Sequence, residues 1–101
     1  MPPTEQEWFA HLAFGAVMAR RLDEAADMYR FLLRFAPQNI AWLLGLAYCL
    51  VNSPQPRRYE DAAAVLQELG TQPLEPHQRA ARERLLRRLA LRRQNAPAAA
   101  A

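Results

Sequence analysis

The sequence contains no lysine, little glycine and a single cysteine, and it has no run of alternating β-branched residues. All 13 of its basic residues are arginine, and 3 of its 101 residues are glycine. Because alternation of Val, Ile and Thr is typical of strands, no β-strand is expected. Cys49 has no second cysteine for an internal disulfide, and it lies between Tyr48 and Leu50. We therefore predict a buried free thiol at this position.

Long apolar runs and a secretion signal are missing as well. Each apolar stretch is interrupted by Arg, Asp or Pro before it reaches the roughly 18 residues that are needed to cross a bilayer. The N-terminus also lacks the basic start of a signal peptide. We therefore expect a soluble, cytoplasmic protein that does not insert into a membrane.

The sequence shows no cluster of residues suited to catalysis. His11 and His77 lie far apart, and no set of Cys, His and carboxylate residues has the spacing of metal ligands. The acidic pairs at 23–24 and 60–61 lie where helices are expected to begin, and negative charge is favourable at that end of a helix. We expect no enzyme activity, no catalytic residue, no metal and no cofactor.

Helix-forming residues are abundant, and they recur in a pattern. Residues 12–17 read LAFGAV, and 34 positions later residues 46–51 read LAYCLV. Residues 20–26, RRLDEAA, return as RRYEDAA at 57–63, now 37 positions later. Three residues are therefore inserted between the two blocks of the second copy. The insertion falls in residues 52–56, where two prolines favour a lengthened turn over a helix.

Each copy predicts a helix, a turn and a second, antiparallel helix, so the fold class is all-α. The five predicted helices run from about 5 to 19, from 22 or 23 to before Pro37, from 40 to 51, from 59 to 69 and from 76 to 93. Thr4 and Glu7 are expected to form a capping box at the first helix, and Gly70 is expected to end the fourth. The organisation is a single domain over residues 1–94, with repeats at about 5–38 and 39–73, a capping helix at 76–93 and a disordered Ala-rich tail at 95–101.

The repeat resembles the tetratricopeptide (TPR) family, whose period is 34 residues. The resemblance is carried by small residues where helices cross, bulky residues one turn after them and a closing proline: Ala13 and Ala47, Ala25 and Ala62, Tyr29 and Leu66, and Pro37. More narrowly, the stretch from Leu12 to Leu46 resembles the small TPR chaperones of bacterial type III secretion systems. That resemblance implies a cytoplasmic chaperone that keeps a secreted or assembling subunit soluble.

The expected binding surface is a concave face lined by the first and third helices. The residues expected to contact a partner are Ala10, Phe14, Val17, Met18, Leu44, Tyr48, Val51 and Asn52. An apolar groove of this kind suits an amphipathic helix or an extended segment, and Phe14 and Tyr48 are its expected anchors. The alternative is that these apolar residues pack inside the protein, because apolar residues at helical spacing often belong to the core.

Two other functions and one further property remain open from the sequence. A general TPR adaptor or assembly factor would use the same groove for a different ligand. The Arg-rich fifth helix is compatible with nucleic acid, but it has no aromatic residues to stack on bases, and an acidic partner surface or a solvated face explains it as well. Because stacked repeats generally need about three copies, we expect a hetero-oligomer, with marginal stability or self-association of the isolated chain.

Overall fold

Five helices and one short turn of 3-10 helix make up the part of the chain that the structure, a computed structural model, describes. Residues 1–95 are described, and they contain no β-strand. The α-helices are α1 (Pro3–Met18), α2 (Leu22–Leu33), α3 (Ile40–Asn52), α4 (Tyr59–Gly70) and α5 (Pro76–Gln94), with the 3-10 turn η1 (Pro56–Arg58) before α4. The predicted all-α class is confirmed, and each helix lies within two residues of its predicted start.

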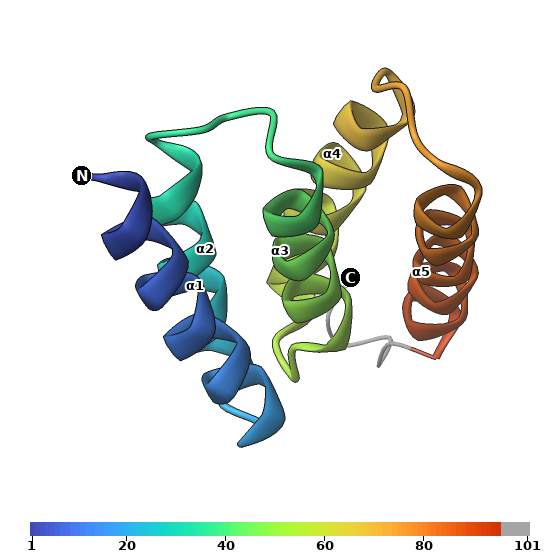
Figure 1. The fold of residues 1–101 in the computed structure, drawn as a ribbon. Coiled ribbons are helices and arrows are strands. Elements are labelled where there is room, and N and C mark those ends of the chain that lie inside the picture. The colour runs from blue at the N-terminus through green and yellow to red at the C-terminus, as the bar shows by residue number, and fades with distance from the viewer. Residues whose placement is uncertain (96–101) are drawn as a thin grey trace.

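The helices form two antiparallel hairpins and a final helix in a two-layer stack. Each helix packs against the next one along the chain, and α3 also contacts α1 and α5. As Figure 1 shows, α1, α3 and α5 lie in one layer, while α2 and α4 lie behind them. Each hairpin begins with a helix in the front layer, and the helix that follows the hairpin lies in that layer again. This arrangement places α3 in the centre of the molecule.

Small residues set the distances between the helices, and leucines fill the space that remains. Four alanines at the predicted crossing and second-helix positions are completely buried: Ala13, Ala25, Ala47 and Ala62. A methyl group allows two helix backbones to approach closely, so neighbouring large side chains can interdigitate. The largest fully buried residues include Leu32, Leu50 and Leu66. Leu85 and Leu89 extend the same cluster into α5, which therefore covers the end of the stack.

The lengthened turn between α3 and α4 is held by a carboxylate at the start of α2. Ser53 Oγ donates a hydrogen bond to Asp23 Oδ1 over 3.0 Å, and Gln55 Nε2 donates to Asp23 Oδ2 over 2.9 Å. The Arg58 guanidinium lies 3.5 Å from the same carboxylate. Arg92 of α5 donates to the carbonyl oxygen of Ser53 over 2.8 Å. A turn therefore lies where the lengthened turn was predicted, between α3 and η1, and polar contacts tie it to α2 and α5.

One prediction about helix ends is wrong, and the other is confirmed. Helix α1 begins at Pro3, so Thr4 lies inside its first turn, and no side-chain cap is formed there. The proline pair at residues 2 and 3 explains the earlier start, because proline is favourable in the first turn of a helix. Helix α4 does end at Gly70, but this glycine does not have the positive φ of a left-handed cap. A Cβ there would lie 2.5 Å from the Arg82 guanidinium, which packs against the helix end.

Cys49 is buried, as predicted, and burial disfavours the thiolate form of its side chain. Burial, with a smaller contribution from the negative charge of Asp23, raises the pKa of the Cys49 thiol to about 12. The thiol therefore stays protonated at neutral pH.

Gly45 and Gly15 provide a test of the packing between α2 and α3. A Cβ on Gly45 would lie 2.6 Å from Cζ of the buried Tyr29 ring, whereas a Cβ on Gly15 would meet nothing within 4 Å. Gly45→Ala is expected to lower the free energy of unfolding by about 1–2 kcal/mol, because the steric cost exceeds the gain in helix propensity. Gly15→Ala should raise it by about 0.5–1 kcal/mol. Urea unfolding measures both, and an equal gain from the two substitutions would show that Tyr29 does not pack closely on Gly45.

Within residues 1–95, no helix combines the length and apolar character that a membrane span requires. The predicted Ala-rich tail lies outside the described residues, except for Asn95.

Candidate functional site

An apolar hollow lies between α1 and α3. It has a volume of about 260 Å³, and its lining is formed by Phe14, Val17, Met18, Tyr29, Gly45 and Tyr48. The absence of a side chain at Gly45 brings the Tyr29 ring close to α3, so α2 contributes to a hollow between two other helices. No charged residue lines it. We refer to these six residues as the apolar half of the site.

Large apolar side chains in this half are open to solvent. The exposed fractions of Phe14, Met18 and Tyr48 are 58%, 68% and 36%. Phe14 and Met18 are four residues apart, so they lie on the same face of α1, next to the face on which Ala13 is buried. Scattered exposed apolar residues are normal, but several gathered around one hollow are typical of a binding surface.

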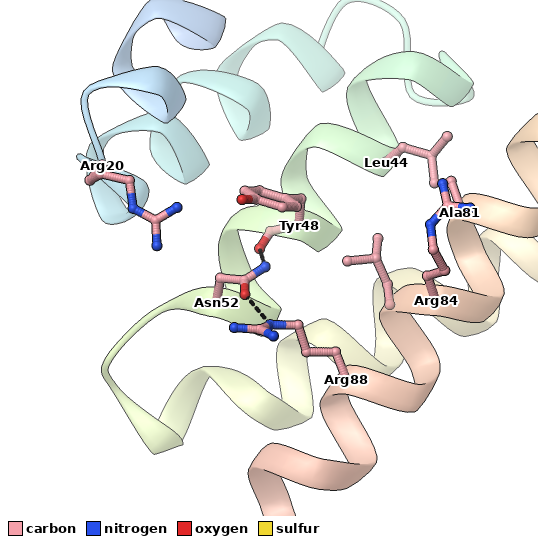
Figure 2. A pocket seen from close by; sticks show the side chains of 8 residues that line it. Arg20, Leu44, Tyr48, Asn52, Ala81, Arg84 and Arg88 are labelled. Atoms are coloured by element: carbon pink, nitrogen blue, oxygen red, sulfur yellow. Dashed lines mark hydrogen bonds between the residues drawn. The ribbon is translucent and has the colours of Figure 1, made fainter.

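A second and larger hollow lies on the other side of Tyr48, between α3 and α5. Its volume is about 540 Å³, and it is lined by Arg20, Leu44, Tyr48, Asn52, Ala81, Arg84, Leu85 and Arg88. In Figure 2, α3 carries Tyr48 and Asn52 in the middle, α5 supplies Arg84 and Arg88 on one side, and Arg20 lies on the other. Three guanidinium groups and no carboxylate line this space. We call these eight residues the basic half of the site.

Hydrogen bonds hold part of the basic half in place. Asn52 Nδ2 donates to the backbone oxygen of Tyr48 over 2.9 Å, and Arg88 Nε donates to Asn52 Oδ1. Both bonds are drawn in Figure 2. The first bond fixes the orientation of the Asn52 amide, so that its oxygen faces α5 and accepts from Arg88. The Arg88 guanidinium is therefore held at the edge of α3 by a neutral group.

Arg20 reaches the basic half from an unusual backbone conformation. Its φ is 63°, the only positive φ of a non-glycine residue within residues 1–95. The turn around it is closed by hydrogen bonds from Arg20 N to Val17 O over 3.0 Å and from Arg21 N to Ala16 O over 2.9 Å. A left-handed conformation costs a residue with a side chain roughly 1–2 kcal/mol. Glycine would avoid this cost, yet the position holds an arginine whose side chain lines the basic half.

Most of the predicted partner-binding residues lie together around Tyr48. Phe14, Val17 and Met18 line the apolar half, Leu44 and Asn52 line the basic half, and Tyr48 lines both. The prediction for Val51 is wrong, because its side chain is 0% exposed and belongs to the core. Ala10 is half-buried against that core and lines neither half.

The contribution of α5 to the site was not predicted. From the sequence, this helix was expected to cap the stack, and its arginines were compatible with nucleic acid, an acidic partner surface or a solvated face. The spacing offered a signal, because α3 begins at Ile40 and α5 at Pro76, which is close to one repeat period later. A helix at that spacing is expected in the layer of α1 and α3, where α5 lies (Figure 1). Arg84 and Arg88 then correspond to Tyr48 and Asn52.

Within the described part of the chain, no group of three or more His, Cys, Asp and Glu side chains is arranged to hold a metal ion. His11 and His77 are both exposed, on α1 and α5. What the site offers chemically is apolar surface for burial and guanidinium groups for anions.

A comparison of the chain with known protein families, with curated proteins and with solved structures finds no match. The fold and the two-part site define an all-α helical stack with an open, two-sided groove on its α1, α3 and α5 layer.

Proposed function

We propose that this protein is a TPR-type binding module, not an enzyme, that holds an amphipathic helical segment of another protein in the groove across α1, α3 and α5. The main observation that supports this proposal is that Phe14, Met18 and Tyr48 are exposed around one uncharged hollow. Burying one such side chain contributes roughly 1.5–3 kcal/mol before the costs of ordering the partner. A partner helix that presents two or three apolar side chains would therefore gain useful affinity.

The most concrete form of this proposal is a cytoplasmic chaperone of a bacterial type III secretion system. It is supported by the resemblance of the first repeat and the third helix to that family, and by a groove suited to covering the aggregation-prone helix of a secreted or assembling subunit. A general TPR adaptor would have the same groove and a partner that is soluble by itself. The two functions therefore differ in what happens to the partner when this protein is absent.

Co-expression tests the proposal directly. The chain is expressed together with each protein encoded beside it in its genome, and the soluble fraction of each neighbour is measured with and without it. We expect one neighbour to be soluble only in its presence and to co-purify with it. A neighbour that co-purifies but is equally soluble alone would support the adaptor. If no neighbour gains solubility or co-purifies, the chaperone proposal is wrong.

A further inference from the structure

The arginines of α5 fall into two groups. Those of the first group serve the fold: Arg82 Nε donates to the Leu66 carbonyl oxygen over 2.7 Å, and Arg92 binds the Ser53 carbonyl oxygen and lies 5.8 Å from the centre of the Tyr59 ring. Arg84 and Arg88 face the basic half instead. Within residues 1–95, Arg20, Arg84 and Arg88 form no ion pair with a carboxylate. The other α5 arginines within these residues also lack an ion pair, so what distinguishes Arg84 and Arg88 is that their unpaired charge lines the hollow.

This gathering of charge is costly, and solubility does not explain it. Arg20, Arg84 and Arg88 line one hollow, and Arg20 does so from a left-handed conformation that is unfavourable for a residue with a side chain. Charge that serves only solubility is equally effective anywhere on the surface, without a strained residue. An unfavourable arrangement that persists in a concave site is typical of a ligand-binding surface.

The position of Tyr48 joins the two halves. Because Tyr48 lines both hollows, a segment lying across it meets Phe14 and Met18 on the α1 side and Arg84 and Arg88 on the α5 side. Arg20 lies next to the end of α1, on the side of Tyr48 opposite the two α5 arginines (Figure 2). Guanidinium groups bind carboxylates through paired hydrogen bonds. The phosphates of a nucleic acid would bind the arginines, but they would leave the apolar half without an apolar contact. The charge and the apolar surface together match a polypeptide that carries both apolar and acidic residues.

We propose that Arg20, Arg84 and Arg88 bind carboxylates of the partner, so that the segment held in the groove is an acidic amphipathic helix. This inference rests on the proposed function and specifies the chemistry of its partner. The apolar face of the helix covers Phe14, Met18 and Tyr48, and the Asp or Glu residues at the edge of that face pair with the arginines. The arginines thereby select among apolar helices, which the apolar half alone would hold without discrimination.

Two synthetic helical peptides test the inference with the full chain. Both have the same leucine face, and one carries Glu where the other carries Gln. Fluorescence anisotropy in 50 mM NaCl should show that the Glu peptide binds about tenfold more tightly, since three partly exposed ion pairs each add a modest gain. Substituting Gln for Arg20, Arg84 and Arg88 should remove this preference, so that the two peptides bind with equal affinity.

A matched variant separates the site from the overall charge. Substituting Gln for Arg79, Arg87 and Arg93 changes the net charge by the same amount, and none of these residues lines the basic half. This variant should keep most of the preference for the Glu peptide. An equal loss of preference in both triple variants would overturn the inference in favour of a general electrostatic effect.

Arg20→Gly gives a second, independent measurement. Glycine relieves the left-handed backbone, so the Tm is expected to rise by about 2–5 °C. The affinity for the Glu peptide should fall by about two- to threefold in the same variant. A higher Tm without any loss of affinity would remove Arg20 from the carboxylate site.

The remaining outcomes distinguish the inference from the function on which it rests. If both peptides bind equally, the arginines do not select acidic partners and the inference is wrong, while the groove remains a polypeptide site. If neither peptide binds, the proposed function fails and the inference fails with it. If single-stranded poly(U) displaces the Glu peptide and binds more tightly, the basic half is a nucleic-acid site and the inference is overturned.

Discussion

Replacing both Phe14 and Tyr48 with Asp is expected to abolish partner binding while the protein stays folded. The two rings are 58% and 36% exposed on opposite sides of the apolar half. Each substitution removes an apolar contact of roughly 1.5–3 kcal/mol, so the double variant should bind at least about 100-fold more weakly. The two new carboxylates would also lose water when an apolar helix covered them, which adds to the cost.

The measurement is the affinity for the Glu peptide by anisotropy, with circular dichroism as the check on folding. Trp8→Asp combined with Leu91→Asp provides the control, because both residues are exposed apolar side chains that line neither half. The control variant should bind as the parent does. Retained binding by the Phe14 and Tyr48 variant would place the site elsewhere, and an equal loss in the control would indicate nonspecific apolar association.

The helices were predictable because their signals are local. Pro37 and Pro54 lie between helices, Pro56 and Pro76 begin η1 and α5, and the repeated blocks set the spacing of the two hairpins. The capping box at Thr4 was a wrong prediction, since the sequence motif does not show where a proline pair will start the helix. The contacts of Asp23 with Ser53 and Gln55 were not predicted, because they join residues about 30 positions apart.

The site was predictable only in part, because half of it depends on tertiary packing. Repeat position correctly brought Phe14 and Tyr48 to one hollow. It failed for Val51, which the packing of the centre of the stack buries completely. The basic half requires two facts that no local pattern contains: the left-handed turn at Arg20 and the face of α5 that meets α3. The sequence of an arginine-rich helix does not determine whether its side chains contact solvent, a backbone carbonyl group or a groove.

The central position of α3 makes its buried leucines the residues on which the stack most depends. Leu50 is fully buried in α3, the helix that contacts α1, α2, α4 and α5. Leu50→Ala is expected to lower the free energy of unfolding by about 3 kcal/mol, through lost burial and the cavity that remains. For a domain of this size the Tm should then fall by roughly 15 °C.

Leu91→Ala is the matched comparison, because Leu91 is 58% exposed on α5. Its effect on the free energy of unfolding should stay within about 0.5 kcal/mol. Thermal and urea unfolding followed by circular dichroism measure both variants. Since a short stack has few contacts that bypass α3, the loss at Leu50 should destabilise both hairpins together, and one cooperative transition at a lower temperature is expected. Two separate transitions would mean that the hairpins fold independently, and the groove between α1, α3 and α5 would then not be preformed.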